Sequence, residues 1–384
     1  MLKLYQSFAV FFLNLVLLIA VSLFILWGAL EIRHVITGRG NVVISDAIKF
    51  DSFRLTTQEV AKATAAEFDA YASSHPFVFN PWTTFMLAPV DGKFLNVLEG
   101  PLLNHRATPN GDTKPVSNPN ITIWCFGGST LYGFGVPDSQ TIPSHLHRIL
   151  NEYGKLGTVK VVNFGQPYWF SSVEVAAYSS LLQSKQRPDV VIFLDGLNDM
   201  ANLVAGRTTP FFSDQGNAAW ARRRNDSRRM LPWLTINESF PLTRITRFVE
   251  ERLLASSTKV PAFRPTDSFD AKRVVGTYMD NIKKAKALSD TFGVSALFFL
   301  QPIPWYGQYV AKNVNAGFPF GNKKTAFSAY EEIAAKFSNR VDANTLHNTL
   351  LNHETPFVDD FHYSDSANAL LASKIAEIVI QSIK

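Results

Sequence analysis

Cysteine is nearly absent from this sequence of 384 residues, which contains only Cys125. A single cysteine excludes an internal disulfide and a cluster of thiolate metal ligands. Because Cys125 stands between Trp124 and Phe126 in an apolar stretch, we expect it to be a small buried core residue. The cysteine content therefore says little about the redox compartment of the protein.

Charged side chains are also scarce in this sequence. They account for 18% of the residues, against 46% for hydrophobic ones, and the formal net charge is +5. This balance indicates a sizeable buried core and argues against global disorder. So small a charge permits attraction to anionic lipid or polysaccharide but does not require a nucleic-acid partner. The length suits one large domain with an appendage, or two modest domains.

Charge is missing altogether from residues 4–30, and residues 8–30 are almost wholly apolar. A helix needs about 20 residues to cross the hydrocarbon core of a bilayer, so this run is long enough to cross it once. A cleavable signal peptide has a shorter apolar core, of about 7–15 residues. No small-x-small cleavage site follows the apolar run before Glu31. We therefore expect a short tail over residues 1–7 and an uncleaved transmembrane signal anchor over residues 8–30, with a cleaved signal as the alternative.

The charges that flank this run leave its orientation equivocal. Lys3 precedes it, and side chains of both signs follow it. Long domains cross membranes largely regardless of flanking charge. We expect a single-pass protein of the cell membrane whose folded domain lies outside the cytoplasm. The charges that follow the run are Glu31, Arg33, Arg39, Asp46 and Lys49.

Residues 31–119 have a mixed pattern that predicts a juxtamembrane stalk or small cap. Apolar residues recur at helical spacing over residues 57–73, which indicates an amphipathic helix, and a proline-rich stretch follows. From Asn120 onward, continuous apolar strands alternate with helices. This alternation predicts a three-layer α/β domain over residues 120–384, with a parallel sheet covered on both faces. The expected strands are 121–126, 159–164, 189–194 and 295–300, and the expected helices are 142–152, 172–184, 277–292 and 364–383.

An insert with poor periodicity interrupts this domain over residues of about 200–270. Its cluster of arginines is interleaved with Trp220 and Trp233. Such a cluster is usually the solvated face of an inserted subdomain, although it also suits contact with anionic headgroups or an acidic glycan. A nucleic-acid role is disfavoured, because no recognised binding motif accompanies the cluster. The arginines are Arg222, Arg223, Arg224, Arg228 and Arg229.

Ser129 is the candidate nucleophile of the domain. It follows a predicted strand and two glycines, Gly127 and Gly128, which allow a tight turn with an exposed backbone N–H. A serine hydroxyl becomes a good nucleophile only when a neighbouring base removes its proton. Taken alone, Gly-Gly-Ser is more often an ordinary turn. It is not a phosphate loop, because no Gly-Lys-Ser/Thr follows at the required spacing.

His362 is the candidate base, three residues after Asp359 and in a loop before the last predicted helix. At this separation one imidazole nitrogen can bind the carboxylate while the other faces a serine. Asp360 is the alternative acid, although the spacing favours Asp359. His353 is the alternative base and lies outside the pattern.

Acyl transfer also requires hydrogen-bond donors for the developing oxyanion. The backbone N–H groups of Ser129 and Gly165 and the side-chain amide of Asn198 are candidates. Gly165 and Asn198 are equally compatible with ordinary turns. However, each of the three follows a different predicted strand, and in a parallel sheet such strand ends meet at one edge.

Four short blocks that carry these residues occur in a fixed order, and the set resembles the SGNH (GDSL-type) hydrolase superfamily. The resemblance covers about residues 120–384. The first block reads Gly-Gly-Ser-Thr rather than Gly-Asp-Ser-Leu, and Ala367 stands where a glycine is common, so the substrate is less certain than the mechanism. The blocks are 126–130 (Phe-Gly-Gly-Ser-Thr), 163–165 (Asn-Phe-Gly), 196–199 (Gly-Leu-Asn-Asp) and 359–362 (Asp-Asp-Phe-His).

The resemblance implies a flavodoxin-like sheet and a site with neither metal nor cofactor. It implies Ser129 as nucleophile, His362 as base and Asp359 as the acid that orients it. Gly165 and Asn198 would be oxyanion donors together with Ser129.

We expect a membrane-anchored serine esterase or acylhydrolase acting on an ester-bearing small molecule, lipid or polysaccharide, such as acyl groups on envelope glycans or lipids. An O-acyltransferase using the same site, and a non-catalytic glycan-binding or assembly protein, are the alternatives. No nucleic-acid partner is expected, and the oligomeric state stays open.

Overall fold

The computed structural model describes residues 2–37, 77–109, 118–184, 187–207, 269–304, 322–359 and 361–383. The chain divides into two compact units, Met1–Asp46 with Trp220–Arg264 and Ala47–Ala219 with Pro265–Lys384. The helix expected over residues 57–73 and the arginine cluster of the insert lie outside the described residues. The predicted division of the whole chain into a stalk and a domain with an insert therefore stays a prediction.

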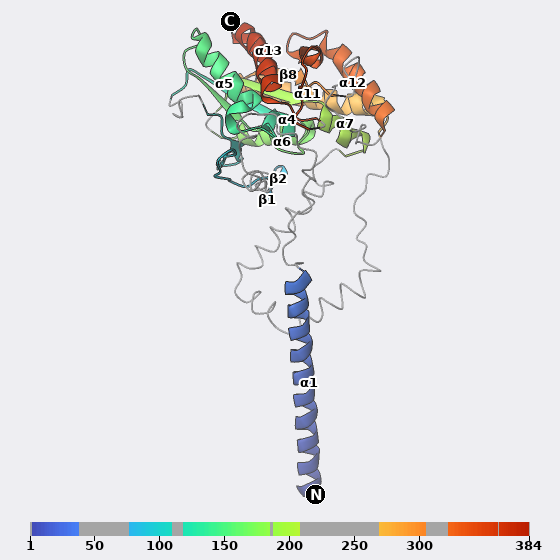
Figure 1. The fold of residues 1–384 in the computed structure, drawn as a ribbon. Coiled ribbons are helices and arrows are strands. Elements are labelled where there is room, and N and C mark those ends of the chain that lie inside the picture. The colour runs from blue at the N-terminus through green and yellow to red at the C-terminus, as the bar shows by residue number, and fades with distance from the viewer. Residues whose placement is uncertain are drawn as a thin grey trace. The chain divides into compact units, whose positions relative to one another are not determined.

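In the first unit, the described part is the helix α1 (Leu2–Thr37), which Figure 1 draws in blue. Most of its described side chains are exposed apolar ones, such as Phe8 (69%) and Leu13 (68%). Among the residues whose side chains the structure describes, no helix qualifies as long and apolar enough to span a membrane. The predicted span over residues 8–30 is thus unsupported here and stays a prediction from the sequence.

The second unit is built around a mostly parallel sheet, so the predicted α/β class is confirmed. The described strands have the order β3-β4-β6-β5-β7-β8-β9, and neighbours from β6 to β9 pair in parallel. β3 and β4 add an antiparallel edge beside β6. The bounds are β3 (Val97–Leu98), β4 (His105–Arg106), β5 (Ile121–Gly127), β6 (Val159–Asn163), β7 (Val190–Asp195), β8 (Ser295–Leu300) and β9 (Ala343–Thr345).

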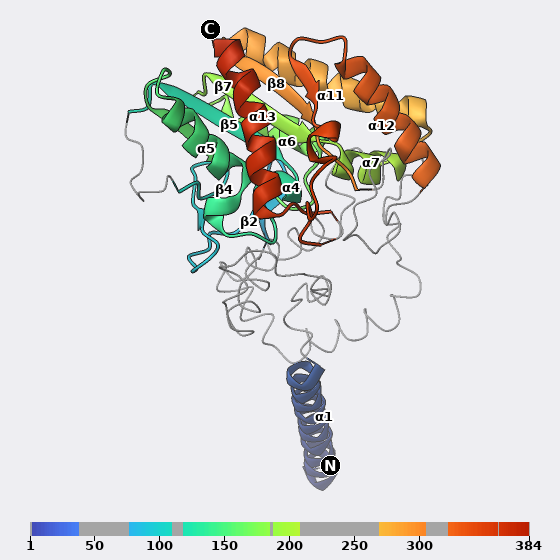
Figure 2. The same cartoon turned by 45° about the horizontal axis from the view of Figure 1, so that its top comes forward.

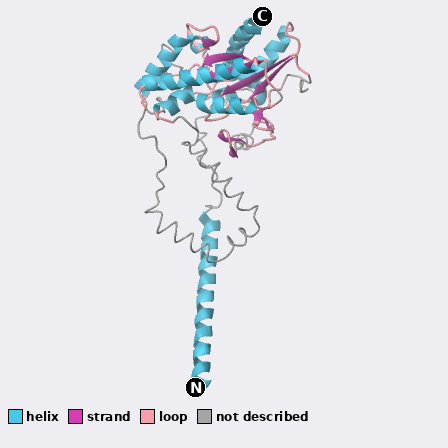
Figure 3. Cartoon of the chain, turned by 180° about the vertical axis from the view of Figure 1, so that it is seen from behind, coloured by secondary structure: helices cyan, strands magenta, loops and turns pink. Residues whose placement is uncertain are grey.

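Helices cover both faces of this sheet, as expected for strands that are apolar throughout. α5 (Ile142–Tyr153) and α13 (Asp365–Ile383) pack against each other on one face (Figure 2). On the other face, α11 (Ala271–Phe292) packs against α6 (Ser171–Leu181), α7 (Leu197–Val204) and α12 (Lys323–Phe337). Figure 3 shows helices over the strands when the domain is seen from behind. The three layers are thus helices, sheet and helices.

The two faces of the sheet have different cores. On the α5–α13 face, Cys125 is 1% exposed and belongs to an aliphatic cluster, as its sequence neighbours predicted. The opposite face carries a row of stacked rings that crosses the strands. Phe126 stacks on Phe164 and Phe193 at centroid distances of 5.3 and 5.4 Å, and Phe193 stacks on Phe298 at 5.4 Å. Offset-stacked rings add to the free energy of burying them, so this row ties together the strands that lead into the site.

The described part of region 31–119 does more than link a stalk to the domain. β3 and β4 belong to the main sheet, and β1 (Phe77–Asn80) pairs with β2 (Thr84–Leu87) in a separate antiparallel hairpin. Short strands with several prolines between them have no clear period, which is why the sequence did not predict them. The eight elements predicted within 120–384 all occur, with ends that differ by a few residues. The short helix α4 (Ser129–Tyr132), the helices α7 and α12 and the strand β9 were missed.

Candidate active site

The chain turns sharply where β5 ends, and this turn exposes Ser129. The short helix α4 (Ser129–Tyr132) begins directly after Gly128. A Cβ atom at Gly128 would lie 2.4 Å from Asn198 Nδ2, and one at Gly127 would lie 2.6 Å from Leu131 Cβ. Both glycines are therefore required for close packing, and Gly128 lets the Asn198 amide reach the backbone beside Ser129. Ser129 itself is half-buried.

The structure brings His362 and Asp359 to this serine from a segment more than 200 residues later in the chain. His362 Nε2 lies 2.8 Å from Ser129 Oγ, and His362 Nδ1 lies 2.6 Å from Asp359 Oδ2. Asp359 Oδ1 accepts the backbone N–H groups of His362 (2.7 Å) and Phe361 (2.9 Å). In the neutral imidazole this pairing places the proton on Nδ1, so Nε2 is left to accept the serine proton.

The surroundings of His362 keep its acid partner ionised. Burial alone would raise the pKa of the Asp359 carboxyl, but the His362 imidazole and the backbone N–H donors bring that pKa below its usual value. The His362 ring also lies between Phe134 and Phe361, at centroid distances of 4.9 and 4.5 Å. These contacts fix the ring plane. The imidazole therefore has one carboxylate partner, one hydroxyl partner and apolar rings beside it.

His353 and Asp360 were the alternatives to His362 as base and to Asp359 as acid. His353 Nε2 makes its hydrogen bond with Ser366 Oγ, at 2.9 Å, rather than with Ser129. Asp360 lies outside the described residues. Among the histidines that the structure describes, His362 is thus the one bonded to Ser129 Oγ.

Asn198 lies at the first turn of α7, immediately beside the turn that carries Ser129. Its Nδ2 donates one hydrogen to Trp169 O at 2.7 Å. A side-chain amide has two hydrogens, so the other is available for a substrate oxygen. Within the described residues, the Ser129 backbone N–H has no hydrogen-bond acceptor. These two donors are suited to a developing oxyanion.

Gly165 is placed differently from the other two expected donors. Its N–H donates to Asn163 Oδ1 at 2.9 Å. A Cβ atom at Gly165 would lie 2.5 Å from Tyr132 N, so the glycine is required where this loop packs against α4. Its role as an oxyanion donor stays a prediction, and that role would require the hydrogen to be shared with Asn163.

Sequence reasoning missed the buried side chains that support the nucleophile turn. Arg106, which is 0% exposed, donates to the carbonyls of Tyr132 (3.0 Å), Gly133 (2.6 Å) and Val136 (2.7 Å) and pairs with Asp138 at 2.7 Å. The guanidinium thus satisfies carbonyls at the end of α4 that no helix bond can reach. No local pattern in the sequence marks this arginine, because its partners lie 26–32 residues away.

A group of buried acids lies beneath Asn198. Burial raises the pKa of Asp195 to about 7, and burial followed by the charge of Asp195 raises the pKa values of Glu174 and Asp199 well above normal. Asp199 accepts hydrogen bonds from the Ser171 hydroxyl (2.5 Å) and backbone N–H (3.2 Å). Among the described residues, no group of three or more His, Cys, Asp and Glu side chains is placed to hold a metal ion.

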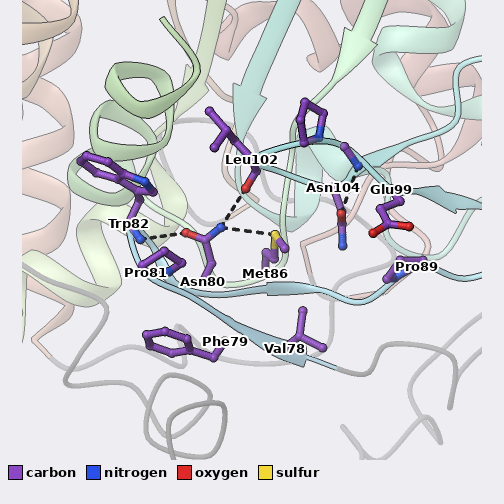
Figure 4. A pocket seen from close by; sticks show the side chains of 12 residues that line it. Val78, Phe79, Asn80, Pro81, Trp82, Met86, Pro89, Glu99, Leu102 and Asn104 are labelled. Atoms are coloured by element: carbon purple, nitrogen blue, oxygen red, sulfur yellow. Dashed lines mark hydrogen bonds between the residues drawn. The ribbon is translucent and has the colours of Figure 1, made fainter. Parts of the chain in front are cut away.

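A cavity of about 400 Å³ lies at the β1–β2 hairpin, and Figure 4 shows its lining. Neither Ser129 nor His362 lines it. Its asparagines bond within the protein: Asn80 Nδ2 donates to Leu102 O at 2.9 Å, and Asn104 Nδ2 donates to Leu87 O at 2.8 Å. These bonds hold the hairpin to the 99–104 segment.

Comparison with solved structures gives several matches of low sequence identity. Est24, a carbohydrate acetylesterase from Sinorhizobium meliloti, has a TM-score of 0.39 at 11% identity, over 68% of this chain and 99% of that one. A lipolytic protein of the GDSL family from Veillonella parvula gives 0.37 at 12% identity, over 68% and 98%. The acetyl xylan esterase AlAXEase gives 0.37 at 14% identity, over 67% and 100%.

No protein-family model matches the sequence, and no curated protein matches it. The similar structures are described as GDSL-type lipolytic proteins, esterases and acetylesterases. At such low identities and TM-scores, we base the function on the geometry of this chain's own residues.

Proposed function

We propose that this chain is a serine ester hydrolase of the SGNH type in which Ser129, His362 and Asp359 form the catalytic triad. One observation carries the proposal: a continuous hydrogen-bonded chain from Ser129 Oγ through both nitrogens of His362 to Asp359, with bonds of 2.8 and 2.6 Å. Serine, histidine and carboxylate in this order are the arrangement that activates a hydroxyl for attack on a carbonyl.

The reaction proceeds through an acyl-enzyme. Ser129 Oγ attacks the ester carbonyl carbon while its proton passes to His362 Nε2. The oxyanion accepts hydrogen bonds from the Ser129 N–H and the free Asn198 amide hydrogen. As the tetrahedral intermediate collapses, His362 gives its proton to the leaving alcohol. Water, deprotonated by His362, then attacks the acyl-enzyme. His362 returns that proton to Ser129 Oγ as the bond between Oγ and the acyl carbon breaks and the carboxylic acid leaves. Asp359 remains ionised throughout and stabilises the imidazolium.

The test is hydrolysis of short-chain nitrophenyl esters by the parent protein and by Ser129→Ala. We expect steady release of nitrophenol from the parent and none above background from the variant, because the proposed nucleophile has been removed. A matched serine-to-alanine control is Ser373→Ala, on the exposed face of α13, which removes a hydroxyl bonded only to Ala369 O. Activity of Ser129→Ala equal to that of Ser373→Ala would refute the proposal.

The acyl acceptor separates hydrolysis from acyl transfer, since both use the same acyl-enzyme. Adding a sugar acceptor to the assay and measuring the ester that forms tests the O-acyltransferase alternative. A glycan-binding protein without turnover would give no nitrophenol from either the parent or Ser129→Ala.

The wider setting of the reaction is also a proposal. A membrane anchor over residues 8–30, with the esterase domain outside the cytoplasm, is supported by the uncharged apolar run in the sequence. In that setting, acyl groups on envelope glycans or lipids are the expected substrates. The similar structures include an esterase described as active on acetylated mannans.

A further inference from the structure

Gln301 stands where β8 ends, between the segment that carries Ser129 and the segment that carries His362. It is 2% exposed. Its backbone is held on both sides, because its N–H donates to Asp195 O at 2.8 Å and its carbonyl accepts the Tyr330 hydroxyl at 2.6 Å. A Cβ atom at Gly196 would lie 3.2 Å from Gln301 Cγ, so the neighbouring chain packs closely against the side chain. Gln301 is therefore held firmly in place at the carboxyl end of β8.

The side chain of Gln301 joins two other side chains. Thr130 Oγ1 donates to Gln301 Oε1 at 3.2 Å, and Gln301 Nε2 donates to Tyr363 OH at 3.4 Å. Tyr363 in turn donates its hydroxyl hydrogen to Pro302 O at 2.6 Å. Because the tyrosine hydrogen is already used, its oxygen accepts from Gln301. The amide nitrogen must then face Tyr363 and the amide oxygen must face Thr130.

This chain of bonds connects the neighbours of the two reacting residues. Thr130 follows Ser129 directly and Tyr363 follows His362 directly. Thr130 and Tyr363 are both buried, at 3% and 1% exposed. The Gln301 amide thus links the segment of Ser129 to the segment of His362 by bonds other than the one between Ser129 and His362 themselves.

We propose that Gln301 is a positioning residue that holds Ser129 and His362 in register for proton transfer. The proposal rests on the esterase function proposed above. Its physical basis is that a displacement of about 1 Å between reacting groups can lower a rate by about 10²-fold. A side chain that fixes both segments to the end of β8 restricts that displacement. The side-chain hydrogen bonds of Gln301 go to Thr130 and Tyr363 rather than to Ser129 Oγ or His362, so Gln301 acts through these two neighbours.

The test compares Gln301→Met, Thr130→Val and Tyr363→Phe. Gln301→Met removes both side-chain bonds of Gln301, Thr130→Val removes one of them, and Tyr363→Phe removes the other together with the bond to Pro302 O, each with little change of shape. For Gln301→Met we expect kcat to fall about 10–100-fold with KM changed less than about twofold. Thr130→Val and Tyr363→Phe lower kcat by smaller factors. In the Gln301→Met background, each of these second substitutions adds less than about a twofold loss, because the link is already broken.

A control separates positioning from stability. Ser289→Ala removes the buried bond between Ser289 Oγ and Tyr178 OH, which lies on α11 and α6. We expect a similar loss in thermal stability with kcat unchanged. Equal kcat in Gln301→Met and the parent, or losses that multiply fully in the double variants, would overturn the proposal. Should Gln301→Met not fold, the double variant of Thr130→Val and Tyr363→Phe replaces it: its loss in kcat should be smaller than the product of the two single losses, and a full product would overturn the proposal. An inactive parent, or an active Ser129→Ala, would instead overturn the esterase function itself.

Discussion

At the scale of single residues, the chemistry of the site depends on which N–H groups already donate to an acceptor within the protein. The Asn198 amide uses one hydrogen on Trp169 O and keeps the other, whereas the Gly165 N–H is engaged by Asn163. Ser129 has a backbone N–H without an acceptor among the described residues. Asn198 and Gly165 were both predicted as oxyanion donors, but only Asn198 keeps a hydrogen free for the substrate. The contribution of Asn198 is also the easier to measure, because it comes from a side chain that a substitution can remove.

Asn198→Ala is expected to lower kcat by about 10²–10³-fold with little change in KM, because a donor to the oxyanion acts mainly in the transition state. Steady-state kinetics on a nitrophenyl ester measures both constants. Asn339→Ala, which removes an exposed asparagine bonded to Ala335 O on α12, is the matched control and should match the parent. A change confined to KM would mark Asn198 as a residue that binds the ground state.

At the scale of elements, three of them bring carboxyl groups together away from water. Glu174 lies on α6, Asp195 ends β7 and Asp199 lies on α7, and all are at most 3% exposed. Neither oxygen of Glu174 has a hydrogen-bond partner among the described residues. Burial raises the pKa of Asp195 to about 7, so the folded protein holds a proton there that the unfolded chain releases near pH 4.

The sign of the resulting pH dependence follows from that difference. Between pH of about 4 and 7 the folded state binds more protons than the unfolded state, so the free energy of unfolding falls as pH rises. Each such proton contributes a slope of at most about 1.4 kcal/mol per pH unit. Asp195→Asn should make the free energy of unfolding depend less on pH. The difference in that free energy between the variant and the parent should therefore shift in favour of the variant between pH 4 and pH 8.

Urea unfolding of the parent and of Asp195→Asn across this pH range measures the difference. Asp280→Asn replaces a carboxylate on α11 whose side chain is 60% exposed, and it serves as the control. Parallel curves for the parent and Asp195→Asn would show that Asp195 is charged in the folded protein, contrary to its burial.

At the scale of the whole molecule, the chain joins a long N-terminal helix to an α/β domain. These belong to separate compact units, each with its own contacts. Residues 8–30 carry no charge, and a helix of about 20 apolar residues inserts into a bilayer because its backbone hydrogen bonds are satisfied internally. The domain holds all the proposed site residues, so the expected membrane attachment and the proposed turnover can be tested separately.

We expect the full chain to sediment with membranes and a chain lacking residues 1–37 to stay in the supernatant with unchanged kcat on nitrophenyl esters. Ultracentrifugation of cell lysates, followed by the esterase assay on both fractions, tests this. A full chain that remains in the supernatant would contradict the anchor, and a truncated chain that loses activity would contradict the separation of the two functions.

Local pattern in the sequence by itself determined the strands that lead into the site and the residues proposed to carry its chemistry, but not the helices α4 and α7. The apolar runs that end at Gly127, Asn163 and Asp195 have a signal contained within a few residues, as does the spacing of Asp359 and His362. The apolar runs can be recognised without the tertiary structure, because a parallel strand that is buried on both faces is apolar throughout.

Only the tertiary structure decided which of these groups are free to act and what holds them in place. Arg106 and Gln301 meet partners that are 26 and 171 positions away, and Ser129 meets His362 at a separation of 233. The engagement of the Gly165 N–H by Asn163 is local but depends on how the loop packs against α4. A hydrogen bond is a matter of distance and direction in space. Residues far apart in the chain acquire that geometry only when the sheet and its helices have packed.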